Sequence, residues 1–149
     1  MKGISILGST GSIGTQALDV VRENRDKFVV KALSCGRNIE LMKAQISEFE
    51  PQLVVTETAD DAKLLRTYFK DKTRNIEFAY GEEGLLELAR YDADLLLNSL
   101  SGMRGMLPTY EAIKARRNIA LANKESLVAG GDVIMSSAAE MGVKILPVD

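Results

Sequence analysis

The sequence predicts an α/β protein with a doubly wound, mostly parallel sheet and helices on both faces. Three observations support this fold class. Short apolar runs typical of strands alternate with amphipathic helical patterns along the whole chain. The first strand–helix unit contains a glycine-rich turn at 8–14, as many nucleotide-binding sheets do. The 149 residues, 46% of them hydrophobic, suffice for one domain with a sizeable core. We therefore treat residues 1–149 as a single domain.

The first two strand–helix units show the pattern most clearly. Residues 4–7 and 28–33 are apolar runs that we expect to form strands. Helices are expected at about 12–25 and 38–49, where apolar residues recur every three or four positions, and Pro51 ends the second helix. The residues expected to face the core are Ile13, Ala17, Val20 and Val21 in the first helix, and Ile39, Met42, Ile46 and Phe49 in the second.

The remainder of the chain repeats this alternation with shorter elements. Apolar or alternating runs predict strands at 53–55, 76–80, 95–97, 119–122 and 143–148. Helical spacing predicts helices near 59–70, 82–90, 105–117 and 124–141, the last with a potential break at Gly130-Gly131. The core face of the helix at 59–70 is expected to comprise Leu64, Leu65, Tyr68 and Phe69.

The turn Gly8-Ser9-Thr10-Gly11-Ser12-Ile13-Gly14 carries the strongest functional signal. The free backbone N–H groups and the positive dipole end of the following helix suit a pyrophosphate. Gly8 would allow a sharp turn, Gly11 a close approach of phosphate to the backbone, and Gly14 close packing of the helix on the sheet. The alternative is a tight turn without a ligand. Its place in the first strand–helix unit favours dinucleotide binding.

The end of the second expected strand predicts which dinucleotide binds. Folds that bind NAD often place an acidic residue here for the ribose hydroxyls, but this segment instead reads Gly36-Arg37-Asn38. An arginine suits the 2′-phosphate of NADP, which a carboxylate would repel. We therefore predict NADP over NAD; the alternative is a solvated arginine at a helix start. Asn38 is expected to cap the next helix, and Cys35 to be a small buried residue without nucleophilic character.

Polar residues follow three later strands. The loop 98–105 could border the nicotinamide half of the cofactor, or be an ordinary strand-to-helix connection. Lys124, within Asn123-Lys124-Glu125-Ser126, could bind an anionic substrate, although a capped helix start explains this segment equally simply. Asp149 could bind Mg²⁺ or Mn²⁺, which favour oxygen ligands, but one carboxylate alone does not make a metal site.

Composition excludes several classes of function. The net charge is −2 with the basic residues spread along the chain, so no nucleic-acid partner is expected. No apolar run approaches the length of a membrane span, so no membrane partner is expected either. A single cysteine, Cys35, allows no internal disulfide and favours a cytoplasmic location. The chain has no histidine, so its chemistry uses no imidazole base.

Four segments together resemble one family, the 1-deoxy-D-xylulose 5-phosphate reductoisomerases, and specifically their N-terminal NADPH-binding domain, which is Rossmann-type. The resemblance covers essentially the whole chain. The pairing of the first and third segments makes it specific. The segments are Leu7-Gly8-Ser9-Thr10-Gly11-Ser12-Ile13-Gly14, Gly36-Arg37-Asn38, Ala122-Asn123-Lys124-Glu125-Ser126 and Pro147-Val148-Asp149.

The resemblance implies a role for each matched residue. It implies that Lys124 contacts a sugar-phosphate substrate and that Asp149 is one of three carboxylate ligands to Mg²⁺ or Mn²⁺ in the full-length enzyme. It assigns no catalytic residue within this chain. The residues implied to bind NADPH are Thr10, Gly11, Ser12 and Ile13 at the pyrophosphate, Gly36, Arg37 and Asn38 at the adenosine 2′-phosphate, and Asn123 and Glu125 elsewhere on the cofactor.

The resemblance also implies a reaction. Members rearrange 1-deoxy-D-xylulose 5-phosphate and reduce the resulting aldehyde with NADPH, giving 2-C-methyl-D-erythritol 4-phosphate in non-mevalonate isoprenoid biosynthesis. They continue past Asp149 with further metal and phosphate ligands, a flap and a C-terminal domain, so we expect this chain to be a fragment that is inactive alone and a homodimer when full length. Arg37 stands where members often have lysine. Two alternatives stay open: the NADP-binding domain of another small-molecule reductase, or a nucleotide-sensing module without catalysis.

Overall fold

The computed structural model describes residues 1–72, 75–122 and 124–148, with the side chains of 124–130 outside that description. Within this part, strands and helices alternate as the sequence predicts. The strands are β1 (Lys2–Leu7), β2 (Phe28–Ser34), β3 (Leu53–Thr56), β4 (Glu77–Tyr80), β5 (Leu95–Asn98), β6 (Asn118–Leu121) and β7 (Ile145–Pro147). The helices are α1 (Ser12–Glu23), α2 (Ile39–Phe49), α3 (Ala59–Phe69), α4 (Gly81–Arg90), the 3₁₀ turn η1 (Gly102–Gly105), α5 (Met106–Lys114) and α6 (Lys124–Met141).

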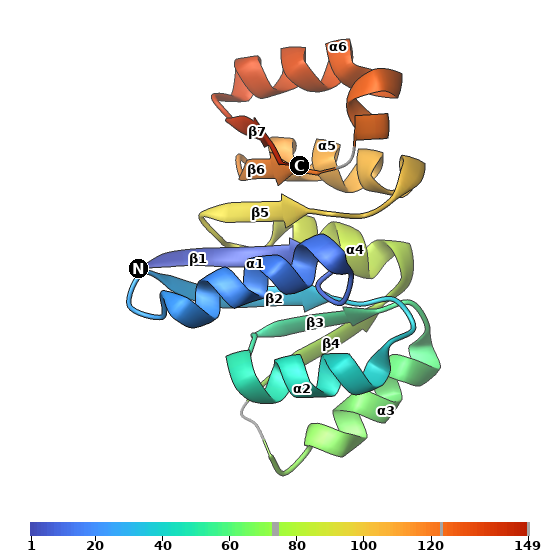
Figure 1. The fold of residues 1–149 in the computed structure, drawn as a ribbon. Coiled ribbons are helices and arrows are strands. Elements are labelled where there is room, and N and C mark those ends of the chain that lie inside the picture. Colours follow the sequence, from blue (N-terminus) through green and yellow to red (C-terminus); the bar gives the residue numbers. More distant parts are fainter. Residues whose placement is uncertain (73–74, 123, 149) are drawn as a thin grey trace.

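The described strands form one sheet in the order β4-β3-β2-β1-β5-β6-β7, and neighbouring strands in it are parallel (Figure 1). The order therefore reverses at β1, where the chain crosses from the β4 edge back to β5. This arrangement confirms the doubly wound fold class. Crevices at such a reversal point, outside the carboxyl ends of the strands, are where open α/β sheets bind ligands.

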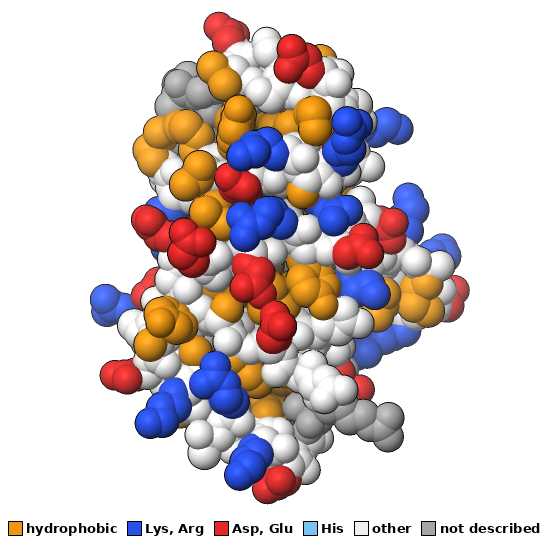
Figure 2. Space-filling view, turned by 180° about the vertical axis from the view of Figure 1, so that it is seen from behind, with side chains coloured by type: hydrophobic (Ala, Val, Ile, Leu, Met, Phe, Trp, Pro, Cys, Tyr) orange, Lys and Arg blue, Asp and Glu red, His pale blue; other side chains and the backbone are white. Residues whose placement is uncertain are grey.

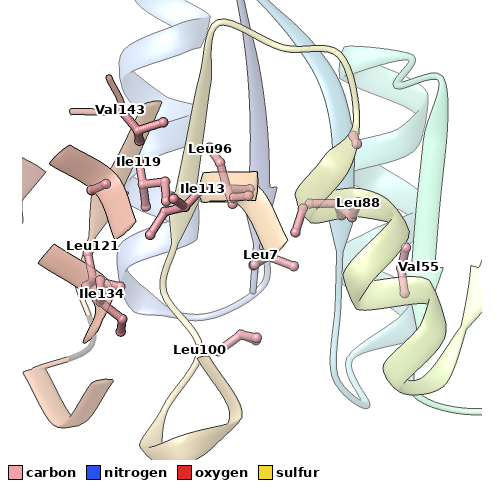
Figure 3. Close-up of a cluster of buried hydrophobic side chains, with 14 of the residues drawn as sticks. Leu7, Val55, Leu88, Leu96, Leu100, Ile113, Ile119, Leu121, Ile134 and Val143 are labelled. Carbon is pink, nitrogen blue, oxygen red and sulfur yellow. The ribbon is translucent and has the colours of Figure 1, made fainter. Parts of the chain in front are cut away.

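Each face of the sheet has its own hydrophobic core. On one face, α1, α2 and α3 contribute Leu18, Ile46 and Leu65 to a cluster with β-strand residues such as Ile6 and Leu33. On the other face, α4, α5 and α6 pack on the sheet. Figure 3 shows residues of this second core, including Leu7, Leu88, Leu96, Ile113, Ile119 and Ile134.

The predicted core faces of two helices are partly confirmed, since Val21, Leu65 and Phe69 are buried, but other members of each face are exposed. In α1, Val20 is 55% exposed and Leu18 is buried instead. In α3, Leu64 and Tyr68 are exposed, whereas the buried residues are Ala62, Leu65 and Phe69. The predicted apolar stripe is therefore wider than the buried face of each helix, and residues at its margin lie in solvent.

Two helix boundaries also differ from the prediction. The helix expected at 105–117 is a 3₁₀ turn, η1, followed by the shorter α5, which begins at Met106. The glycine pair at 130–131 does not break α6, which runs continuously from Lys124 to Met141. Glycine lowers helix propensity by only about 1 kcal/mol, and α6 is long enough to tolerate it.

Helices α1 to α3 lie over the β1–β4 half of their face (Figure 1). Beside α1, an open apolar groove of about 350 Å³ is lined by β1, β5 and β6 residues and by Val148, among them Ile4, Leu95, Leu97 and Ala120. On the opposite face, over α4 to α6, the described acidic and basic side chains are interspersed (Figure 2). None of the described helices combines the length and apolar character needed to cross a membrane.

Candidate functional site

The glycine-rich turn leaves β1 through a backbone conformation that favours glycine. Gly8 has φ = +83°, and a Cβ built there would lie 2.8 Å from Oγ of Ser99. Gly14 lies in the first turn of α1, where a Cβ would overlap the carbonyl oxygen of Gly8 and lie 2.7 Å from Cα of Ser9. Both glycines are therefore required by the turn itself, since no side chain fits at either position.

Gly11 differs from the other two glycines of the turn. Its φ is −83°, and a Cβ there would make only an ordinary contact, 3.7 Å from the carbonyl oxygen of Gly8. It is exposed at the start of α1. The fold alone therefore does not require glycine at position 11. A missing side chain at this point leaves the backbone open to a ligand.

A buried polar network holds the turn against β2 and α2. The backbone N–H of Gly8 donates to Oγ of Ser34 at 2.9 Å, and the N–H of Ser9 donates to the Ser34 carbonyl at 2.7 Å. Gln45 of α2 holds Ser9 on two sides: its Oε1 accepts from Ser9 Oγ at 2.7 Å, and its Nε2 donates to the Ser9 carbonyl at 2.9 Å. Ser9 and Gln45 are both buried. The sequence alone gives Gln45 no role, because its partner Ser9 lies 36 positions away along the chain.

The loop after β5 closes the other side of the turn. Oγ of Ser99 donates to the carbonyl oxygens of Leu7 and Gly8 at 2.7 and 3.1 Å. Asn98 is fully buried and donates through Nδ2 to the Gly105 carbonyl and to Thr109 Oγ1, at 3.0 and 2.8 Å. The loop 98–105 is thus fixed in place at the point where the strand order reverses.

The start of α1 is open to an anion. The N-cap residue of α1 is Gly11, which has no side chain to cap the helix, and the first turn of α1 contains no acidic residue. The hydroxyl of Ser12 accepts a hydrogen bond from Gln16 at 3.3 Å, while the side chain of Ile13 packs into the core. Thr10 is partly exposed beside them. Ile13 could therefore contribute only its backbone N–H to a ligand, whereas Ser12 could also offer its hydroxyl.

The second turn, Gly36-Arg37-Asn38, is held by local hydrogen bonds, one of which joins the N–H of Ile39 to the Arg37 carbonyl at 2.8 Å. Arg37 extends into solvent with its side chain 96% exposed, and its Nε lies 4.0 Å from Oε2 of Glu57. Oδ1 of Asn38 accepts from the N–H of Leu41 at 3.1 Å, which confirms the predicted helix cap. Arg37 is therefore positioned at the carboxyl edge with no fixed conformation imposed by burial.

A cavity of about 440 Å³ opens between these two turns. It is lined by Gly8, Ser34, Cys35 and Gly36 on one side, and by Leu86 and Leu100 among the apolar residues of the other. Thr10, Gly11, Ser12 and Ile13 are not part of this lining; they continue the turn from Gly8 to α1. Burial raises the pKa of the Cys35 thiol to about 12, with smaller contributions from Asp61 and Glu57, so Cys35 stays a neutral thiol as expected.

Two charged residues that line this cavity, Glu57 and Arg104, were given no role by the sequence analysis. Glu57, at the end of β3, lines the cavity and lies within 4.0 Å of Arg37. Arg104 of η1 reaches the same carboxylate at 3.9 Å. The turn η1, at the end of the loop 98–105, thus brings Arg104 to the carboxylate that lies beside Arg37. No local sequence pattern identifies Glu57, because its charged neighbours Arg37 and Arg104 lie far from it in the sequence.

Four predicted site residues cannot be placed in this way. Asn123 and Asp149 lie outside the described residues, and the side chains of Lys124 and Glu125, in the first turn of α6, lie outside the described side chains. Across the described portion of the chain, no group of three or more histidine, cysteine, aspartate or glutamate residues could hold a metal ion. The predicted roles of these four residues stay predictions.

Comparison with known protein families gives one consistent match. Residues 4–131 match the family model described as 1-deoxy-D-xylulose 5-phosphate reductoisomerase. Curated relatives of that name include proteins from Shouchella clausii, 51% identical, and Agathobacter rectalis, 54% identical, each over the whole of this chain. The chain spans 39% of the length of each of these two relatives.

Solved structures give the same match. A DOX-P reductoisomerase crystallised with magnesium superposes with a TM-score of 0.93 at 33% identity, over 100% of this chain and 37% of its own. The enzyme from Zymomonas mobilis in complex with NADPH superposes with a TM-score of 0.92 at 32% identity, over 99% of this chain and 38% of its own. A biliverdin reductase from Synechocystis, at 14% identity and a TM-score of 0.60 over 97% of this chain and 37% of its own, shares the fold alone.

Proposed function

The chain belongs to the 1-deoxy-D-xylulose 5-phosphate reductoisomerase family, and from this premise we propose that residues 1–149 are its NADPH-binding domain. The observation that carries the proposal is Gly11. The turn has no internal need for glycine there, yet position 11 begins an uncapped helix at the reversal point of the sheet. A pyrophosphate approaching that backbone supplies the reason for the missing side chain.

The residues of the two turns fit the two ends of the cofactor. We assign the pyrophosphate to the backbone N–H groups of Gly11, Ser12 and Ile13, with the hydroxyls of Thr10 and Ser12 as further donors. The buried hydrogen bonds between Ser9 and Gln45 hold this backbone in place before the cofactor binds. When bound, NADPH would supply a hydride to the substrate.

We assign the adenosine end of the cofactor to the second turn. Arg37 would pair with the 2′-phosphate, and Gly36 would allow the ribose to approach β2, because a Cβ at Gly36 meets nothing closer than 3.5 Å. Asn38 has its side-chain oxygen committed to capping α2, so it would contact the cofactor through its amide nitrogen or backbone. The neighbouring cavity would receive the adenosine.

For the full-length protein we propose the family's reaction, the conversion of 1-deoxy-D-xylulose 5-phosphate to 2-C-methyl-D-erythritol 4-phosphate. This proposal rests on identity near 50% to curated relatives that carry that name. In it, Asn123 and Glu125 contact NADPH, Lys124 contacts the sugar phosphate, and Asp149 is one carboxylate ligand of Mg²⁺ or Mn²⁺. We further propose a cytoplasmic homodimer as the full-length form. The 149-residue chain is expected to bind cofactor without turnover.

The test is a calorimetric titration of the chain with NADPH and with NADH, alongside Arg37→Ala. We expect NADPH to bind more tightly than NADH. Arg37→Ala should weaken NADPH binding by about ten- to a hundredfold, because a charge-assisted hydrogen bond contributes roughly 1.5–3 kcal/mol. It should leave NADH binding and thermal stability unchanged, since the Arg37 side chain is 96% exposed.

Lys27→Ala provides the matched control, because Lys27 is an exposed cation in the turn before β2, at the amino end of the sheet. It should leave the affinities for both cofactors unchanged. Equal loss in both variants would reduce the Arg37 effect to general electrostatics and contradict the assignment of the 2′-phosphate. If neither cofactor binds to the 149-residue chain or to the full-length protein, the proposed function is contradicted.

A further inference from the structure

A carboxylate lies beside the end of β2, although the sequence there contains no acidic residue. The end of β2 carries Arg37 and no acidic residue, but β3, the next strand in the sheet, ends beside it with Glu57. A Cβ built on Gly36 would lie 3.5 Å from Oε1 of Glu57, so the carboxylate reaches the backbone of the second turn. Glu57 therefore brings a carboxylate close to the end of β2, the strand end where many dinucleotide sites carry an acidic residue.

This carboxylate lies between two guanidinium groups from opposite sides of the cavity. Its Oε2 is 4.0 Å from Nε of Arg37, and its Oε1 is 3.9 Å from a terminal nitrogen of Arg104. The Glu57 side chain is one-third exposed, Arg104 is 57% exposed and Arg37 almost entirely exposed. The three side chains together carry a net charge of +1 toward whatever binds in the cavity.

We propose that Glu57 sets how strongly this site prefers a cofactor with a 2′-phosphate over one without it. The inference rests on the proposed NADPH binding and extends it to a residue outside the predicted site. The carboxylate competes with the 2′-phosphate for Arg37 and Arg104 and repels it directly. A free ribose hydroxyl, by contrast, can donate a hydrogen bond to the same carboxylate. Glu57 thus weakens NADPH binding and favours NADH.

The geometry favours competition over a role in orienting Arg37. Both ion pairs lie at the outer limit of contact, 3.9 and 4.0 Å, which is longer than a hydrogen bond. Pairs of this kind between exposed side chains hold each other weakly, so loss of Glu57 does not cost Arg37 a fixed conformation. A phosphate dianion at hydrogen-bonding distance binds a guanidinium more strongly than a carboxylate 4 Å away does.

The experiment compares Glu57→Gln with the parent chain by calorimetric titration with NADPH and with NADH. The glutamine keeps the shape of the side chain and removes its charge. We expect the ratio of the NADH dissociation constant to the NADPH dissociation constant to rise about three- to tenfold in the variant. The gain should shrink at high salt, because screening reduces the repulsion that the substitution removes. Thermal unfolding of both proteins shows that the fold is kept.

Glu82→Gln is the matched control, because Glu82 lines the same cavity from α4. It should change the ratio by less than half as much as Glu57→Gln. An unchanged or lowered ratio in a folded Glu57→Gln chain whose parent binds NADPH would overturn the role of Glu57 and leave the proposed function standing. Absence of binding of both cofactors, to the parent chain and to the full-length protein alike, would contradict the proposed function itself.

Discussion

The two turns at the carboxyl edge of the sheet, 8–14 and 36–38, both join a parallel strand to a helix, yet they are built in opposite ways. In the first turn, the backbone is held by hydrogen bonds with the side chains of Ser34, Gln45 and Ser99. In the second, the backbone makes few such contacts, and a long side chain, Arg37, extends from it almost fully exposed.

The difference separates two kinds of recognition. The backbone N–H groups of residues 8–14, here called the cradle, have the same chemistry whatever the side chains are. They therefore suit the pyrophosphate that all dinucleotides share. An exposed charged side chain can be changed without disturbing the fold, so it suits the group that distinguishes one dinucleotide from another. Changes at the tightly packed positions of the first turn, such as Gly14, should therefore alter stability together with binding, whereas changes at Gly11 or at Arg37 should alter binding alone.

The largest expected effect is that of Gly14→Ala. Its Cβ would overlap the carbonyl oxygen of Gly8 and lie 2.7–2.9 Å from Ser9 backbone atoms, which cannot move aside without breaking the cradle. We expect a loss of about 3 kcal/mol or more in the free energy of unfolding, measured by chemical denaturation. Gly131→Ala is the control: its Cβ meets open space within α6, so stability should stay constant or rise. Equal effects at both sites would refute the steric account.

The next largest effect is expected for Gln45→Leu. The leucine keeps the volume of the side chain but leaves the Ser9 carbonyl without its donor, and the site is buried. The free energy of unfolding should fall by about 2 kcal/mol. Gln16→Leu, at an exposed glutamine of α1, should change it by less than about 0.5 kcal/mol. A Gln45 variant as stable as the parent would show that the cradle does not depend on α2.

Gly11→Ala tests the contrast within the first turn. The new Cβ makes only an ordinary contact, so we expect the free energy of unfolding to change by less than about 0.5 kcal/mol. Affinity for NADPH and NADH should fall by about tenfold or more for both, roughly 1.4 kcal/mol, because the methyl group stands between the backbone and the shared pyrophosphate. Undiminished binding in calorimetry would remove the main support for phosphate binding at α1.

The smallest effect is expected from two neighbouring carboxyl groups outside both turns, where a substitution should change stability but not cofactor binding. Burial and the neighbouring carboxyl group of Glu77 raise the pKa of Glu87 in α4. The stability that this group contributes is thus present at low pH and is lost as the pH rises through its folded-state pKa. Glu87→Gln should be more stable than the parent near pH 7 by less than about 1 kcal/mol, and the difference should vanish near pH 4. Thermal unfolding at both pH values measures the change in stability. Cofactor titrations at pH 7 check that the affinities of the variant and the parent are the same.

The alternation of elements was predictable because it depends on local patterns. The strands at 28–34 and 95–98 and the helix at 39–49 all lie within two residues of their predicted bounds. The exposed positions of Val20 and Leu64 were not predictable, since helical periodicity identifies an apolar stripe but not how wide a contact the sheet will make with it. Strand order likewise depends on packing between segments far apart in sequence.

The candidate site divides along the same line. The glycine-rich turn and the Asn38 cap follow from residue types at adjacent positions, so the sequence predicts them. Gln45 and Glu57 belong to the site only because α2 and β3 bring them there, and an isolated glutamine or glutamate gives no signal in a single sequence. The proposed cofactor preference was argued from Arg37 alone, and Glu57 adds a charge that such reasoning could not include.

The attachment of Ser9 to Gln45 limits how far the glycine-rich segment can be transplanted. Residues 8–14 contain the full motif, but the partner that fixes their shape comes from a helix two elements later. A peptide of the first strand, turn and helix would carry every glycine and still sample many loop shapes. Grafting the segment into another α/β scaffold would therefore transfer phosphate affinity only if a buried amide were supplied at the matching place on the neighbouring helix.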